Sequence, residues 1–199
     1  MLNNRRPSPI RDGMDAGEET ERRFEVATLG GGCFWCTEAV FKGMRGVIKV
    51  EPGYSGGRSE DATYKRVSTG RTGHAEVVQV TFDPEEISFG DILEIFFATH
   101  DPTSLNRQGA DVGPQYRSVV FYHDEGQRRV TEETIERLDE EKIWRRPIVT
   151  RVERFDAFYR AEEYHLDYYE RNRGQPYCRL VIDPKIAKLQ ERFRDRLKK

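Results

Sequence analysis

Apolar and polar residues change period repeatedly along the chain, and each change predicts a secondary-structure element. Alternation and short apolar runs predict strands at 24–30, 47–57, 74–83, 118–123 and 148–155. Helical spacing predicts helices at 33–46, 88–101, 124–142, 160–172 and 183–199. This order favours an α/β (α+β) fold of split-βαβ type, a two-layer ferredoxin-like sandwich with helices packed on a mixed β-sheet.

Local signals mark several helix ends. Ser88 is an expected N-cap and Gly46 an expected stop for the first helix. In the closing helix, Asp183 is the expected cap and Pro184 lies in the first turn. One face of that helix carries the apolar residues Ile186, Leu189, Phe193 and Leu197.

Two long segments have no periodicity. Residues 52–73 are rich in turn-forming residues, and residues 101–117 are too long to serve as a simple connector. Long irregular segments of this kind are typically functional. We therefore expect both to contribute to a site.

Length and charge restrict the class of protein. The chain has 199 residues and a formal net charge of −2, which indicates no general affinity for nucleic acid or anionic membranes. It has no apolar run of membrane-spanning length, and its start lacks the apolar stretch of a signal peptide, so a cytoplasmic location is expected. Residues 1–22 are expected to be a disordered extension, and 23–199 a single catalytic domain with a Cys-containing tail and closing helix.

The cysteine content points to redox chemistry. There are three cysteines, too few for a disulfide framework and more typical of catalytic thiols in a reducing compartment. The four histidines show no paired spacing with them, so no metal site is expected.

The stretch "GGGCFWC" at 30–36 is the strongest candidate site. A cysteine in the first turn of a helix meets free backbone N–H groups and the positive end of the helix dipole, which favour the thiolate at Cys33. Cys36 lies three residues on, on the same helical side. Phe34 and Trp35 between them would wall a pocket for a small apolar group.

Several longer motifs occur in a fixed order. They are "GCFWCTEAVF", "GYSGG", "TYKRVSTGRTGHAEVVQVTFDP", "HDPTSLNRQGADVGPQYRSVVFY", "AEEYHLDYY" and "QPYC". With them, the chain from about residue 24 to 183 strongly resembles the A-type peptide-methionine sulfoxide reductases, which act on the S epimer.

The resemblance implies a role for each matching position. Cys33 is the implied nucleophile that attacks the sulfoxide sulfur, and Glu76 the acid that protonates the sulfoxide oxygen. The phenols of Tyr64 and Tyr116 would hydrogen-bond that oxygen, and Asp111 would line the same pocket. Phe34 and Trp35 would hold the substrate methyl group.

The resemblance further implies that the oxidised nucleophile is resolved to a disulfide, which thioredoxin reduces, and that no metal or organic cofactor is needed. Substrates would be methionine sulfoxide, free or in proteins, in the repair of oxidative damage. Cys178 matches the resolving cysteine of the family. At the position of Cys36 many members have Gly, although others carry a cysteine there. Both thiols therefore remain candidates for the first attack on Cys33.

Some positions near His165 depart from the family pattern. Arg160 stands where Pro is usual, and Leu166 where Gln is usual. His165 itself either orders the site or is a partnered helical histidine.

Two other functions compete with this reading. A general Cys-X-X-Cys dithiol-disulfide oxidoreductase would use Cys33 and Cys36 but leave Glu76 without a role. A binding module for methionine-rich or oxidised segments would carry inert cysteines.

Overall fold

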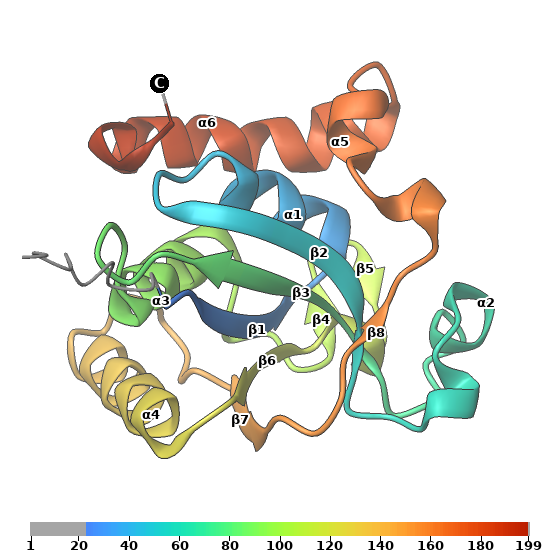
Figure 1. Ribbon diagram of the computed structural model, residues 1–199, viewed down its shortest axis with the longest axis horizontal. Coiled ribbons are helices and arrows are strands. Elements are labelled where there is room, and N and C mark those ends of the chain that lie inside the picture. Colours follow the sequence, from blue (N-terminus) through green and yellow to red (C-terminus); the bar gives the residue numbers. More distant parts are fainter. Residues whose placement is uncertain (1–22, 199) are drawn as a thin grey trace, which may run out of the picture.

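The computed structural model describes residues 23–198, so the extension predicted at 1–22 lies outside the described residues. Its main sheet has six strands in the order β7-β6-β1-β3-β2-β8 (Figure 1). In chain order these are β1 (Glu25–Gly31), β2 (Val47–Ser55), β3 (Ala75–Phe82), β6 (Ser118–Tyr122), β7 (Arg151–Arg154) and β8 (Tyr159–Arg160). A short separate hairpin joins β4 (Arg107–Gln108) to β5 (Asp111–Val112).

Within residues 23–198, six α-helices accompany the strands. They are α1 (Phe34–Lys42), α2 (Tyr64–Val67), α3 (Phe89–Thr99), α4 (Glu125–Glu140), α5 (Tyr168–Arg171) and α6 (Asp183–Arg192). No helix in the stretch 23–198 is long and apolar enough to cross a membrane.

The centre of the sheet confirms the predicted split-βαβ fold. Strands β6, β1, β3 and β2 are neighbours in this order, and each adjacent pair is antiparallel. Helix α1 lies between β1 and β2 in the chain, and helix α3 lies between β3 and β6. The outer strand β7 pairs in parallel with β6, which makes the sheet mixed. Helices α1 and α3 pack on the sheet and α6 packs across both of them, as Figure 1 shows for α6 over α1.

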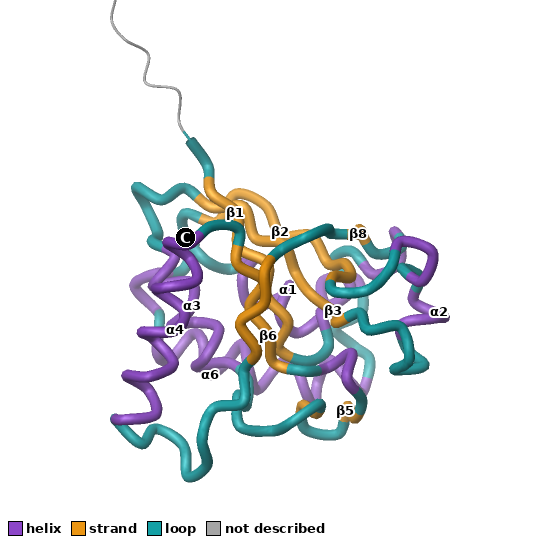
Figure 2. The backbone as a smooth tube through the Cα atoms, turned by 90° about the horizontal axis from the view of Figure 1, so that it is seen from below, coloured by secondary structure: helices purple, strands orange, loops and turns teal. Residues whose placement is uncertain are grey.

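Alternation along the strands sorts their side chains onto two faces. In β3, Val78 and Val80 join the large core under the helices, whereas Ala75 and Val77 join a smaller cluster on the other face. Figure 2, turned by 90°, shows the strands as a twisted band with α3 and α4 to one side and α2 and β8 to the other.

The turn from β1 into α1 places the cysteine motif beside β3. Gly30 lies so close to β3 that an added Cβ would be 3.0 Å from the carbonyl oxygen of Glu76. Gly32 adopts a φ of +101°, a conformation that favours glycine. The strand therefore ends in a sharp turn that brings Cys33 next to Glu76.

The C-terminal third differs most from the sequence predictions. The continuous helix predicted at 160–172 was wrong, because the segment contains β8, a 3₁₀ turn at Glu163–His165 and the short α5. Asp167, with a φ of 55°, interrupts it. The start of this segment instead forms β8, which pairs with the edge of β2 so that Gly53 lies opposite Arg160.

Helix ends also differ in detail. Helix α1 ends at Lys42, before the predicted stop at Gly46, which instead turns the chain into β2 with a φ of +80°. Ser88 caps α3 as predicted, with Asp91 completing a capping box. Asp183 is the first residue of α6 rather than its cap, because the π-helical turn Cys178–Ile182 runs directly into it.

Candidate active site

Cys33 occupies the N-cap of α1, immediately after the glycine turn. Its backbone is non-helical, with φ −59° and ψ 127°, and its side chain is only 7% exposed. The next residue, Phe34, donates its backbone N–H to Glu76 Oε2 at 3.1 Å. A free N–H at the start of a helix thus binds the carboxyl group that the resemblance assigns as the acid.

Glu76 is the second residue of β3 and is 2% exposed. Burial raises its pKa to about 8, against the opposing effect of the Phe34 N–H. Because that value lies above neutrality, the carboxyl group carries a proton at pH 7. A buried, protonated carboxyl group beside a thiol is able to donate a proton to a neighbouring oxygen.

The two thiols of the motif share one hydrogen bond. Burial raises the pKa of Cys33 well above its usual range, and the hydrogen bond with Cys36 and the charge of Glu76 add to this. The same bond lowers the pKa of Cys36 to about 7, assisted by the charge of Lys185 and the hydroxyl of Tyr177. Burial therefore opposes the effect of the helix start on Cys33, whose thiol donates a hydrogen bond to Cys36.

The aromatic pair between the cysteines points to different surroundings. Phe34 is fully buried, with its ring centroid 5.8 Å from that of Tyr54. Trp35 is half-buried and stacks on Tyr168, with centroids 3.6 Å apart and planes at 6°. Trp35 Nε1 also donates to His165 Nδ1 at 3.1 Å. Trp35 is thus the member of the pair that remains at the surface of the site, held in one orientation.

His165 resolves one question that the sequence leaves open, because it orients Trp35 and packs 4.9 Å from the Phe34 ring. It is buried, and burial lowers its pKa, which keeps the imidazole neutral and able to accept at Nδ1. Its Nε2 is buried without a hydrogen-bond partner, 3.9 Å from Glu162.

Glu162 links strand β2 to the start of α2 behind the site, a connection that the sequence reasoning missed. Its carboxylate accepts from the Tyr54 hydroxyl at 2.8 Å and from the Tyr64 backbone N–H at 2.9 Å. These bonds hold the start of α2, and therefore Tyr64, against the sheet. Only the fold brings these residues together, so no sequence motif marks the network.

The two predicted phenols come from separate loops and converge on the same groups. Tyr64 begins α2, and Tyr116 ends a 3₁₀ turn at Pro114–Tyr116. Burial raises the pKa of both, and the charges of Glu76 and Cys33 raise them further. Both hydroxyls are therefore protonated at neutral pH and lie within electrostatic reach of the predicted acid and nucleophile.

Tyr177 also lies in this site, and sequence reasoning missed it. Its hydroxyl donates to Asp111 Oδ2 at 2.8 Å and lies 3.7 Å from Cys36 Sγ. Its ring meets Trp35 edge-on, with centroids 5.7 Å apart at 81°. The motif "QPYC" contains this tyrosine, although the family resemblance assigns a role only to the cysteine that follows it. Tyr177 covers Trp35 and the thiol pair in this structure.

Cys178, the other candidate resolving thiol, lies on the inner side of the same segment. It opens the π-helical turn and is fully buried in the core. Burial raises its pKa, and the charges of Asp183 and Cys36 act in the same direction. All three cysteines are free thiols.

The structure thus brings all nine predicted site residues into one region around the start of α1. Within 23–198, no group of three or more His, Cys, Asp or Glu side chains is arranged to hold a metal ion. The arrangement combines a buried thiol pair, a protonated carboxyl group and two phenols, which together suit thiol attack on an oxygen-bearing sulfur atom.

Comparisons with known proteins agree with this geometry. The family model described as peptide methionine sulfoxide reductase matches residues 25–197. Relatives named peptide methionine sulfoxide reductase MsrA include that of Sulfolobus acidocaldarius, 57% identical over 172 residues, which are 86% of this chain and 97% of the relative. That of Saccharolobus solfataricus is 58% identical over 174 residues, 87% of this chain and 97% of the relative.

Solved structures show the same fold. Reduced Mxr1 from Saccharomyces cerevisiae superposes with a TM-score of 0.71 at 34% identity, covering 78% of this chain and 89% of that chain. Mxr1 in complex with Trx2 gives a TM-score of 0.51 at 26% identity, covering 71% and 84%.

Proposed function

The chain belongs to the peptide methionine sulfoxide reductase family, and we propose that it reduces the S epimer of methionine sulfoxide, free and in proteins, to methionine. The observation that carries this proposal is the buried, protonated Glu76 bound to the N–H of the residue that follows Cys33. A sulfoxide oxygen leaves sulfur only when it is protonated, and this carboxyl group supplies the proton.

In the first step, Cys33 Sγ attacks the sulfoxide sulfur. The Cys36 thiolate, which shares a hydrogen bond with the Cys33 thiol, accepts its proton as Cys33 attacks the substrate sulfur. As the new S–S bond forms, the oxygen gains negative charge, which the hydroxyls of Tyr64 and Tyr116 stabilise while Glu76 donates its proton. The hydroxyl group then moves from the substrate sulfur to Cys33 Sγ. The new S–S bond breaks in this transfer and its electron pair stays on the substrate sulfur, so the products are methionine and Cys33 sulfenic acid.

In the second step, a thiol of the chain attacks Cys33 sulfenic acid, forming a disulfide and releasing the hydroxyl group as water. We assign this attack to Cys36, because it already contacts Cys33, whereas Cys178 is packed in the core. A disulfide requires a Cα separation of roughly 4.4–6.8 Å, and the non-helical N-cap backbone of Cys33 supports such closure. Cys178 is then a candidate to relay the disulfide outward.

In the third step, an external dithiol reduces the disulfide by two electrons and leaves oxidised. The complex of the relative Mxr1 with Trx2 supports thioredoxin as this donor. The scheme uses no metal or organic cofactor. We propose a cytoplasmic location, which rests on thiols that need a reducing compartment.

The substrate pocket in this proposal lies between Trp35 and the phenols, with Asp111 at its edge. Trp35 receives the methyl group, while Phe34 supports the pocket from the core. Because Tyr177 covers Trp35, it must move aside when substrate binds.

A general dithiol-disulfide oxidoreductase is disfavoured, because disulfide exchange has no use for a protonated carboxyl group and paired phenols. A binding module is disfavoured, because a mutually hydrogen-bonded thiol pair has no role in binding alone.

The test is turnover of separate S and R epimers of methionine sulfoxide with dithiothreitol, measured as methionine formed. We expect turnover of the S epimer only, abolished in Cys33→Ser. Absence of turnover with either epimer, with the thiols confirmed reduced, would refute the proposal.

A further inference from the structure

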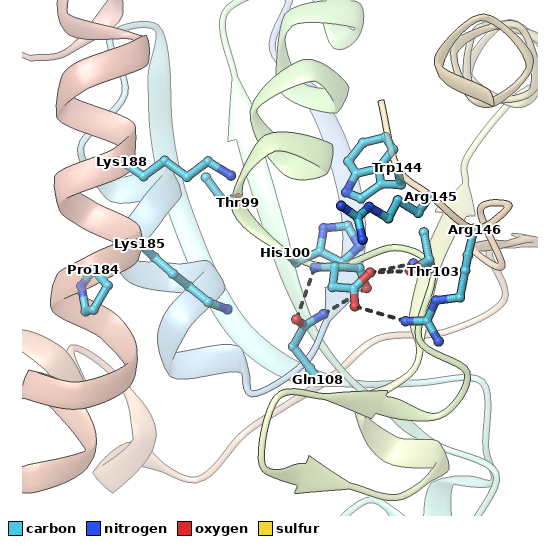
Figure 3. Close-up of a pocket in the computed structure, with 11 residues that line it drawn as sticks. Thr99, His100, Thr103, Gln108, Trp144, Arg145, Arg146, Pro184, Lys185 and Lys188 are labelled. Atoms are coloured by element: carbon cyan, nitrogen blue, oxygen red, sulfur yellow. Dashed lines mark hydrogen bonds and ion pairs between the residues drawn. The ribbon is translucent and has the colours of Figure 1, made fainter. Parts of the chain in front are cut away.

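A cavity of about 590 Å³ lies outside the site described above (Figure 3). It is bounded by the end of α3, the start of α6, the segment after α4 and the β4–β5 hairpin. None of Cys33, Glu76, Tyr64 and Tyr116 lines it, so it is not the place where the sulfoxide would bind. We name it the basic groove, lined by Thr99, His100, Asp101, Thr103, Gln108, Trp144, Arg145, Arg146, Pro184, Lys185 and Lys188.

The charge of the basic groove is strongly positive although the whole chain carries −2. Its one acid, Asp101, is engaged within its own loop by Thr103 and Ser104 and pairs with Arg146 at 3.8 Å. Within residues 23–198, no carboxylate lies in ion-pair range of Arg145, Lys185 or Lys188. Three cations therefore face the cavity without a protein counter-charge.

The basic groove adjoins the thiol pair. Thr99, His100 and Lys185 also line a second, much smaller cavity, of which Cys36 forms a wall. The positive charge of Lys185 is one of the causes that lower the pKa of Cys36. A molecule bound in the groove would thus lie next to the thiol that we assign to disulfide formation.

The spread of the cations indicates the size of the ligand. In Figure 3, Lys185 and Lys188 project from α6, while Arg145 and Arg146 lie on the opposite side with Trp144. A single small anion contacts one of these sides, whereas a peptide segment with several carboxylates spans both. Trp144 and Pro184 add flat apolar surface, which is typical of protein contacts.

We propose that the basic groove docks an acidic surface segment of the protein that reduces the enzyme's disulfide. This inference rests on the proposed function, because that protein must approach the enzyme's disulfide, which we assign first to Cys33 and Cys36. Positive charge beside the disulfide would steer an acidic donor to this face of a chain that otherwise repels it. The groove is a recognition surface, and the thiol exchange itself takes place at the cysteines.

The test compares two double variants with the same change in net charge. Arg145→Glu with Lys188→Glu reverses two exposed groove cations, and Arg45→Glu with Arg154→Glu reverses two exposed cations elsewhere. Lys185 is left intact because it acts on Cys36. Each protein is first oxidised to its disulfide with diamide, so that the readout does not depend on methionine sulfoxide. The rate of reduction by a thioredoxin of net negative charge is then followed against its concentration.

We expect the second-order rate constant to fall about tenfold in the groove variant and to lose its dependence on ionic strength. The control variant should behave like the native protein. Dithiothreitol should reduce the disulfide of the native protein and of both variants at the same rate. Equal thioredoxin rates in the two variants would overturn the proposal, as would a parallel loss with dithiothreitol. Failure of the proposed function would appear separately, as absent turnover of the S epimer with dithiothreitol.

Discussion

The hydroxyl of Tyr177 donates a 2.8 Å hydrogen bond to the Asp111 carboxylate. This bond joins the segment before Cys178 to the irregular loop at 101–117, two regions that meet only in the folded chain. It places the tyrosine over Trp35 and beside Cys36, so the C-terminal segment completes the wall of the candidate active site.

Tyr177→Phe should raise the pKa of Cys36 above its present value of about 7. The phenol hydroxyl is one of the groups that lower this pKa, and phenylalanine keeps the ring contact with Trp35 while removing the hydroxyl. The measurement is the pH dependence of alkylation by iodoacetamide, with modified Cys36 identified by mass spectrometry. Tyr169→Phe is the matched control, since it removes a 2.8 Å bond to Asp183 instead. An unchanged midpoint in Tyr177→Phe would contradict the assignment.

Glu76→Gln should lower turnover by about a hundredfold, because the amide keeps the shape of the carboxyl group but cannot donate a catalytic proton. In the native protein the acid is active while protonated, so activity should decline as pH rises through about 8. The amide variant should lack this decline. A pH profile of kcat/KM for both proteins provides the test, and an unaltered profile would exclude Glu76 as the acid.

The same carboxyl group should affect stability. Its folded-state pKa is raised above the ordinary value of 4.5, so its contribution to stability is fully present below that value and is lost as pH rises through about 8. We expect urea unfolding of the native protein to show this loss as pH rises from about 4.5 to about 8, the interval between the ordinary pKa of the carboxyl group and its pKa in the folded protein. Glu76→Gln should be less sensitive to pH over that range.

The order of the thiols can be read from one turnover without reductant. With one equivalent of the S epimer, the native protein and Cys178→Ser should both form the Cys33–Cys36 disulfide. Cys36→Ser should retain Cys33 sulfenic acid, trapped by dimedone, for longer than the native protein. Peptide mapping distinguishes the products, and a Cys33–Cys178 link as the first disulfide would reverse the assignment.

Gly32→Ala should destabilise the protein by about 1–3 kcal/mol, because a non-glycine residue is strained at positive φ. An added Cβ would also lie 2.6 Å from Gln108 Cγ, so the β4–β5 hairpin would have to move. Gly109→Ala separates the two effects, since its φ is +60° but nothing lies within 4 Å of the added atom. Thermal unfolding should therefore show a larger loss for Gly32→Ala, and equal losses would exclude the clash with Gln108.

Much of the fold follows from local patterns in the sequence. Alternation in β3 and helical spacing with the Ser88 cap in α3 are properties of neighbouring residues, and local propensity and burial agree there. The helix predicted at 160–172 was wrong because local pattern and tertiary contacts disagree there. Its spacing is compatible with a helix, but pairing of Arg160 with the edge of β2 and the left-handed Asp167 break it.

For the site, the sequence by itself determined which chemical groups are available: the cysteine pair on a glycine turn and the motifs that contain Glu76, the phenols and Cys178. Tertiary structure decided how their pKa values shift. Burial raises the pKa of Glu76 to about 8, and the hydrogen bond between Cys33 and Cys36 lowers the pKa of the second thiol to about 7. Tyr177 joins the site, and the cations of α6 and the loop after α4 share a cavity, because packing brings distant segments together. Desolvation and through-space charge depend on three-dimensional neighbours, which spacing along a chain does not specify.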